Sequence, residues 1–266
     1  MDGITHISQT FEQARLQGRA ALMPYYTLGY PNLADSQAIV EAIAEAGADL
    51  VELGVPFSDP LADGPTIQRS TQTALERGAS VRHCLELTAR LRQAGVDQPL
   101  LLMGYYNPIL AYGVERYAAA AAQAGADGFI VPDLPPEEAG ELEAACQRHG
   151  LALVFMLSPN STSERIAAVA ARTHGFIYLV SLTGVTGARQ ALPDHLQEFI
   201  TRVRQQARIP LAVGFGISTP EQAQQVGRLA DGVIVGSALI NAVDQAQDPC
   251  QGAGEFVASL RRALDS

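Results

Sequence analysis

The chain has 266 residues, of which 47% are hydrophobic and 17% are charged, and its formal net charge is −10. This composition excludes a disordered chain and provides enough apolar side chains for a large core. A nucleic-acid-binding protein needs a basic surface, and no Lys- or Arg-rich run is present. No apolar run approaches the roughly 20 residues that cross a bilayer, and the first residues lack the features of a signal peptide. We therefore expect a cytoplasmic protein with no nucleic-acid and no membrane partner.

Short apolar segments alternate with longer segments of helical period along the whole chain. The apolar segments predict strands at residues 20–28, 49–53, 99–103, 128–131, 152–157, 176–180, 211–213 and 232–235. The segments between them predict helices at residues 33–46, 81–94, 114–123, 136–149, 163–173, 194–206 and 220–229. Additional helices are expected over about the first 18 residues and over residues 254–264.

Eight βα units in one chain predict an α/β protein with a (β/α)8 TIM barrel that occupies residues 1–266 as a single domain. The nearly continuous apolar character of the strands fits parallel strands buried on both faces. A doubly wound open sheet is the competing architecture, but no G-x-G-x-x-G follows the first strand. The phrase AGAD occurs at residues 46–49 and 124–127, with LADG at 229–232, each just before a strand, which indicates a repeating βα unit.

The segment VELGVPFSDPLADGPTIQ, residues 51–68, contains three carboxylates. Glu52 lies inside an apolar strand, where burial raises the pKa of a carboxyl and lets it hold a proton near neutral pH. Asp59 and Asp63 follow in a Gly- and Pro-rich segment, and an aspartate in this wetter loop would stay ionised and stabilise positive charge. The competing interpretation is a polar loop with a strand-end glutamate bonded to the backbone.

Several other polar residues follow predicted strands, at the barrel face where active sites lie. Tyr105, Tyr106 and Asn107 follow the third strand, and Asp133 follows the fourth. Glycine-bearing loops follow the sixth, seventh and eighth strands, where backbone N–H groups and helix N-termini often bind phosphate. The candidate phosphate ligands are Gly187, Gly216, Gly236 and Ser237, which otherwise serve only as turn and helix-entry residues.

Two further features suggest an enclosed pocket. Residues 58–79 and 182–192 form candidate closing loops, in which Thr186 would bond Asp63, although both segments also fit ordinary surface loops. The larger side chains near this face could line an apolar pocket for a flat substrate or simply fill the barrel: Tyr25, Met103, Ile130, Met156 and Tyr178. Cysteines and histidines are scattered, with no metal-binding spacing, so we expect no metal site.

Six segments, in order and spacing, resemble the α subunit of tryptophan synthase over nearly the whole chain. They are YYTLGYP at 25–31, ELGVPFSDPLADGPTIQ at 52–68, GYYNPIL at 104–110, VPDLPPEE at 131–138, TGVTGAR at 183–189 and GFGIS at 214–218. The resemblance implies a lyase of tryptophan biosynthesis that cleaves indole-3-glycerol phosphate to indole and D-glyceraldehyde 3-phosphate by a retro-aldol step.

By this resemblance, Glu52 is the acid and base at the third indole carbon and at the side-chain hydroxyl, and Asp63 stabilises the indole nitrogen. Tyr178 lies near the substrate, Thr186 engages the catalytic aspartate, and the four glycine and serine positions bind phosphate. Tyr25 stands where many members have Phe, and Met103 and Met156 stand where branched aliphatic residues are common.

The resemblance also implies a partner, a pyridoxal-phosphate-dependent β subunit that receives indole in a heterotetramer of two α and two β subunits. Asp59, Pro60, Asn107 and Pro135 match loop positions on the docking face, and the α chain itself is expected to hold no cofactor. Alternatives are another phosphate-sugar barrel enzyme, a catalytically silent regulatory subunit and a free-standing lyase. The intact Glu52 and Asp63 disfavour the silent subunit.

Overall fold

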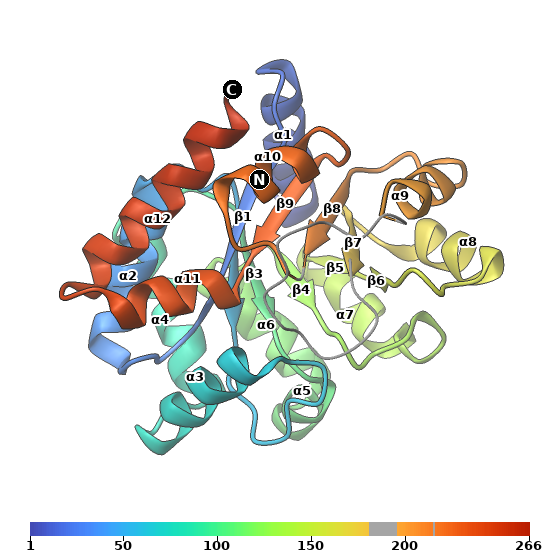
Figure 1. The fold of residues 1–266 in the computed structure, drawn as a ribbon. Helices are drawn as coiled ribbons and strands as arrows, with labels where there is room; N and C mark the ends of the chain where they lie inside the picture. The colour runs from blue at the N-terminus through green and yellow to red at the C-terminus, as the bar shows by residue number, and fades with distance from the viewer. Residues whose placement is uncertain (181–195, 215) are drawn as a thin grey trace.

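The computed structural model describes residues 1–180, 196–214 and 216–266. Its strands form one parallel sheet with helices around it (Figure 1). The strands are β1 (Ala21–Thr27), β2 (Val51–Gly54), β3 (Leu100–Met103), β4 (Gly128–Ile130), β5 (Ala152–Val154), β6 (Met156–Leu157), β7 (Ile177–Val180), β8 (Leu211–Gly214) and β9 (Gly232–Val235). Each of the eight predicted strand segments is confirmed, and the fifth is divided in two.

The strand order is β5-β4-β3-β2-β1-β9-β8-β7-β6, and every pairing is parallel. Only Phe155 separates β5 from β6, so the two ends of this order are joined by the chain itself and the sheet closes into a barrel. The break has a local cause, because the N–H of Phe155 donates to the Thr173 hydroxyl at 3.1 Å instead of to a neighbouring strand. The (β/α)8 barrel is therefore confirmed.

The helices are α1 (Gly3–Leu16), α2 (Leu33–Glu45), α3 (Pro65–Glu76), α4 (Val81–Gln93), α5 (Tyr106–Tyr112), α6 (Val114–Ala124), α7 (Gly140–His149), α8 (Ser163–Arg172), α9 (Leu196–Arg204), α10 (Pro220–Gly227), α11 (Ser237–Gln245) and α12 (Pro249–Leu264), with a 3₁₀ turn, Pro136–Glu138, before α7. The predicted N-terminal and C-terminal helices are α1 and α12. In the described part of the chain, no helix combines the length and the apolar character needed to cross a membrane.

The prediction of a long loop over residues 58–79 was wrong in its second half, where the chain forms α3. The start of the helix has a favourable sequence, because Gly64 is the N-cap and Pro65 lies in the first turn, where proline is well tolerated. Its buried face includes Ser70 and Thr71, so the apolar periodicity that predicts a helix is weak. Ser70 is satisfied inside the protein, where its hydroxyl donates to the Ile67 carbonyl at 2.9 Å.

The repeated aspartate of the AGAD and LADG phrases has one structural role in all three copies. Asp49, Asp127 and Asp231 each precede a strand and accept a hydrogen bond from the backbone N–H at the start of an adjacent strand, at 2.7 to 2.8 Å. An arginine also pairs with each aspartate. The repeat therefore fastens neighbouring strands together at the N-terminal end of the barrel, opposite the face that holds the cavity described next.

Candidate active site

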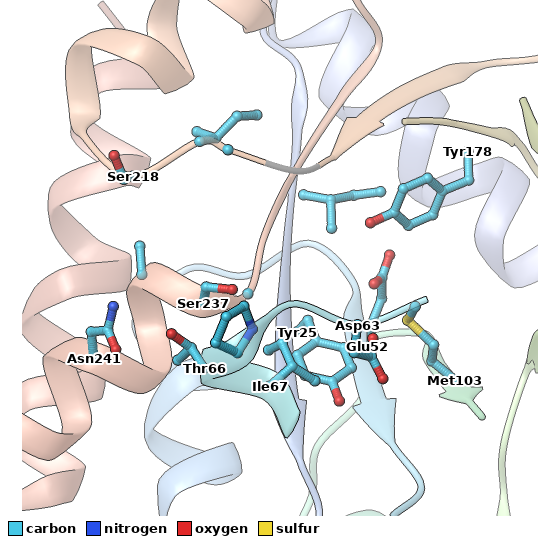
Figure 2. A pocket seen from close by; sticks show the side chains of 16 residues that line it. Tyr25, Glu52, Asp63, Thr66, Ile67, Met103, Tyr178, Ser218, Ser237 and Asn241 are labelled. Carbon is cyan, nitrogen blue, oxygen red and sulfur yellow. The ribbon is translucent and has the colours of Figure 1, made fainter. Parts of the chain in front are cut away.

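A cavity of about 230 Å³ opens at the C-terminal ends of the strands. Figure 2 shows Tyr178, Asp63 and Met103 toward one end of this pocket and Ser218 and Asn241 toward the other. Of the residues predicted from the sequence, the structure brings together in this lining Tyr25, Glu52, Asp63, Met103, Tyr178, Gly216, Gly236 and Ser237. Carboxyl groups thus share one pocket with glycine-bearing loops, as expected for a substrate that carries a phosphate.

Glu52 is placed by the register of three neighbouring strands. It lies on β2 opposite Tyr25 of β1 and Leu101 of β3. The residue is completely buried, and neither carboxyl oxygen has a hydrogen-bond partner among the described residues. Burial raises the pKa of Glu52 well above its usual range, which favours the protonated form of the carboxyl. The alternative of a glutamate bonded to backbone is therefore wrong.

A buried carboxyl without a partner is costly in a folded protein, so its retention calls for a functional explanation. Glu52 lines the cavity, where a ligand can supply the missing contacts. A protonated carboxyl in an apolar site is the state required of a general acid.

Asp63 lies in the loop between β2 and α3, immediately before the N-cap residue of that helix. Its Oδ2 accepts a hydrogen bond from the Tyr105 hydroxyl at 3.0 Å. Burial raises the pKa of Asp63 to about 6, while the bond from Tyr105 acts in the opposite direction. The loop is thus less wet than the sequence suggested, and Asp63 is ionised at neutral pH by a narrow margin.

Two tyrosines frame the acids. The Tyr25 hydroxyl, which had no predictable partner, lies 3.3 Å from Thr27 Oγ1, and this oxygen lies 2.8 Å from Ser70 Oγ on α3. Burial raises the pKa of Tyr178 well above its usual range, and the carboxyls of Glu52 and Asp63 raise it further. Both phenols are therefore neutral and act as polar edges on an otherwise apolar wall.

Two glycines, Gly216 and Gly236, line the cavity. Gly216 has a φ of 82°, in the left-handed region that favours glycine. Gly236 is the N-cap of α11, and a Cβ at this position would lie 3.3 Å from atoms of Tyr25. The α11 N-terminus, with Ser237 as its first residue, provides unpaired N–H groups and positive potential beside the pocket.

Several predicted residues lie elsewhere. Ile130 and Met156 are not part of the cavity lining, and Met156 borders a separate depression that includes Val131 and Arg165. Thr186 and Gly187 lie outside the described residues. The four predicted interface residues all lie in segments that follow β2, β3 or β4, with Asp59 and Asn107 exposed and Pro60 and Pro135 partly exposed.

The structure adds residues that sequence patterns did not select as site residues. Tyr105 was noted only because it follows a strand, and its bond to Asp63 depends on the position of a loop that starts from another strand. Thr66 and Ser218 line the cavity from segments quoted for the family resemblance, in which they were not selected as site residues, and Asn241 lines it from α11, outside all of these segments. Within the described ranges, no group of three or more His, Cys, Asp or Glu side chains could hold a metal ion.

Comparison with known proteins identifies the family. Residues 11–264 match the family described as tryptophan synthase alpha chain. The chain belongs to this family. The alpha chain of Roseiflexus sp. strain RS-1 is 53% identical over 262 residues, which cover 98% of this chain and 97% of the relative. The alpha chain of Chloroflexus aurantiacus is 50% identical over 263 residues, which cover 98% of this chain and 99% of the relative.

Solved structures of the family share the fold. Tryptophan synthase subunit alpha from Legionella pneumophila superposes with a TM-score of 0.92 at 39% identity, covering 100% of this chain and 99% of that structure. A chain of Mycobacterium tuberculosis tryptophan synthase gives a TM-score of 0.91 at 39% identity, with 98% of each chain covered. The alpha subunit of tryptophan synthase is a lyase that cleaves indole-3-glycerol phosphate and channels indole to the beta subunit.

Proposed function

We propose that Glu52 and Asp63 carry out this cleavage by acid–base catalysis, with the phosphate bound at the glycine-rich end of the cavity. The observation that carries the proposal is the buried carboxyl of Glu52, which faces the pocket with both oxygens unpaired among the described residues. Burial favours the protonated form of this carboxyl, which can then donate its proton to a ring carbon of the substrate.

The reaction balances without an added co-reactant. Glu52 donates its proton to the third indole carbon, and the positive charge that develops on the ring nitrogen is stabilised by the Asp63 carboxylate. The Glu52 carboxylate then removes the proton of the adjacent side-chain hydroxyl. The bond between the ring carbon and the side chain breaks, its electron pair restores the ring double bond, and the hydroxyl oxygen becomes the carbonyl of D-glyceraldehyde 3-phosphate.

The amino-acid composition supports this route over a Schiff base. All 18 basic residues of the Lys plus Arg count are arginines, so the chain has no lysine with which to form an imine with a carbonyl compound. The same absence fits the placement of pyridoxal phosphate on the beta subunit, since that cofactor is normally bound through a lysine. The described pocket therefore offers acid–base catalysis by the carboxyl groups of Glu52 and Asp63.

The docking of a beta subunit is supported by the surface around the cavity. Leu61 is 93% exposed and lies beside the predicted interface residue Pro60. Leu110, on the same helix as Asn107, is 49% exposed. Exposed leucines in segments that follow β2 and β3, at the end of the barrel that holds the pocket, are a suitable surface for a partner that receives indole. The proposed assembly is a heterotetramer of two alpha and two beta subunits.

The first experiment measures indole release from indole-3-glycerol phosphate by the wild-type chain and by Glu52→Gln, with and without a beta subunit. We expect wild-type release to rise with the beta subunit and the variant to lose about 10²–10⁴-fold in either condition. Unchanged release by Glu52→Gln would refute the catalytic role. Release that is indifferent to the beta subunit would contradict the channelled assembly and leave a free-standing lyase.

A phosphate test should avoid Gly216, because its positive φ makes any side chain there strain the backbone even when no ligand is bound. Ser237→Ala removes one hydroxyl without changing the backbone. We expect it to raise the KM for indole-3-glycerol phosphate and to leave the affinity for indole unchanged. Equal effects on both ligands would contradict the phosphate assignment.

A further inference from the structure

The wall of the cavity between α3 and α11 is polar but has no partner. Thr66 of α3 and Ser237 and Asn241 of α11 all line the pocket, and Figure 2 shows Thr66 and Ser237 close to the side that carries Asn241. None of these three side chains has a hydrogen-bond partner among the described residues. No arginine of the described chain lines the cavity, so the described donors available to a bound phosphate are neutral.

Asn241 is positioned to be one of these donors. It lies four residues after Ser237, so the two side chains occupy the same face of α11 about one turn apart. The free N–H groups of the first turn and the amide of Asn241 therefore border the same volume. An asparagine amide supplies two N–H donors, which a phosphate, being an acceptor, can use.

We propose that Asn241 is a further phosphate ligand, donating its side-chain amide to the phosphate of indole-3-glycerol phosphate. The inference rests on the proposed function and adds to it a residue that the glycine-rich motifs do not contain. An ion pair between Arg69 and Asp244, about one helical turn from the residues that line the cavity, holds Asn241 in position.

This ion pair joins α3 to α11. Arg69, three residues after Thr66, pairs with Asp244, three residues after Asn241. Tyr30 completes the cluster, since its hydroxyl donates to the Asp244 carboxylate and accepts a hydrogen bond of 3.1 Å from Arg69. The cluster fixes the separation of the two helices directly behind the residues that face the cavity. Arg69 thereby positions Asn241 without touching the ligand.

The experiment compares wild type, Asn241→Ala and a control, Gln245→Ala, which removes an amide from the same helix face one turn farther on. Inorganic phosphate and indole serve as separate probes in titration calorimetry, and catalysis is measured with indole-3-glycerol phosphate. We expect Asn241→Ala to weaken phosphate binding about tenfold and to raise KM, with indole affinity and kcat little changed. Gln245→Ala should behave as wild type.

Unchanged phosphate affinity in Asn241→Ala would overturn the assignment, and so would an equal loss of indole affinity, which would indicate general damage to the pocket. The calorimetric titrations with inorganic phosphate and indole do not require turnover. The phosphate-ligand role of Asn241 and the proposed catalytic function can therefore fail separately. A wild-type chain that does not cleave indole-3-glycerol phosphate contradicts the proposed function, while selective loss of phosphate binding in Asn241→Ala still supports the ligand role.

The positioning role is tested by a double-mutant cycle. Arg69→Ala should raise KM by about threefold, and Arg69→Lys should restore part of the loss because it keeps the charge facing Asp244. If Arg69 acts through Asn241, Arg69→Ala should add nothing to KM in an Asn241→Ala background. Additive losses in the double variant would refute the positioning role, since a merely structural effect persists without Asn241.

Discussion

Asp63 gives the site an acid limit that can be measured and shifted. Burial raises its pKa to about 6 from an ordinary 3.8, and the Tyr105 hydroxyl opposes this rise through its hydrogen bond. Since the proposed mechanism requires the carboxylate, kcat/KM should fall as the pH drops through about 6. Tyr105→Phe removes the hydrogen bond to the ionised form, so the same fall should occur at a higher pH.

The size of both effects follows from the contacts. A hydrogen bond to a charged group contributes about 1.5 kcal/mol or more, which corresponds to about one pKa unit. The acid limit should therefore move from about 6 in wild type to about 7 in Tyr105→Phe. Tyr106→Phe is the matched control, because the Tyr106 hydroxyl makes no contact with Asp63 among the described hydrogen bonds.

Stability should change with pH in the opposite direction to activity. The folded chain binds the Asp63 proton more tightly than the unfolded chain, so the free energy of unfolding falls as the pH rises from about 4 to about 6. A shift of about two units corresponds to about 3 kcal/mol. Asp63→Asn lacks this titration, and the difference between its unfolding curve and that of wild type isolates the contribution of one carboxyl.

The measurements are pH profiles of kcat/KM and urea unfolding curves, each from about pH 4 to about pH 9. An acid limit that is equal in wild type and Tyr105→Phe would refute the link between Tyr105 and Asp63. A stability difference between wild type and Asp63→Asn that does not change between about pH 4 and about pH 6 would refute the burial of the carboxyl.

Three further substitutions test other parts of the structure. Glu52→Leu should raise the thermal midpoint while lowering the cleavage rate, because it replaces a buried carboxyl that has no described partner by an apolar side chain; a lower midpoint would contradict that burial cost. Gly54→Ala places a Cβ 2.1 Å from the Tyr25 hydroxyl and should raise KM and lower stability, whereas Gly140→Ala, with open space around it, should not lower stability; similar melting curves would refute the close approach. Asp127→Ala should lower stability by about 3 kcal/mol, measured by urea unfolding, because it leaves a strand N–H without its acceptor and removes the carboxylate that pairs with Arg92; a change below about 1 kcal/mol would contradict the fastening role of the repeat.

The barrel could be predicted because its signals are local. Each strand is a short apolar segment, each surrounding helix has an amphipathic period, and their alternation fixes the architecture. The helix α3 escaped prediction because its buried side chains include hydroxyls: Ser70 donates to the Ile67 carbonyl of the same helix and also contacts Thr27 of β1. The boundary between β5 and β6 escaped for a similar reason, since a threonine side chain distant in sequence takes the Phe155 N–H. That residues 1–266 fold as a single domain stays a prediction.

The residues of the site also differ in whether their environment depends on neighbours in the sequence or on residues distant from them in the sequence. Glu52 was predictable as a buried acid from the apolar residues on either side, and the structure places it in a fully buried position, where burial raises its pKa. The state of Asp63 was not predictable, because it depends on burial and on Tyr105, which bonds to the loop from the segment that follows β3. Neither the unpaired amide of Asn241 nor the Arg69–Asp244 pair leaves a sequence pattern, since each arises where two helices meet.

The separation of the two carboxyls between a strand and a loop explains how they hold different protonation states in one cavity. Glu52 is fixed by strand register among apolar neighbours, and nothing in its described surroundings stabilises a negative charge. Asp63 begins a helix-entry turn and receives a phenol hydrogen bond, which favours its ionised form. Complete burial favours the neutral form of Glu52, while the Tyr105 hydrogen bond favours the ionised form of Asp63, so the first suits the role of acid and the second that of carboxylate. The Tyr105 hydroxyl therefore tunes the pH range in which Asp63 is ionised, while the burial of Glu52 sets the role of the other carboxyl.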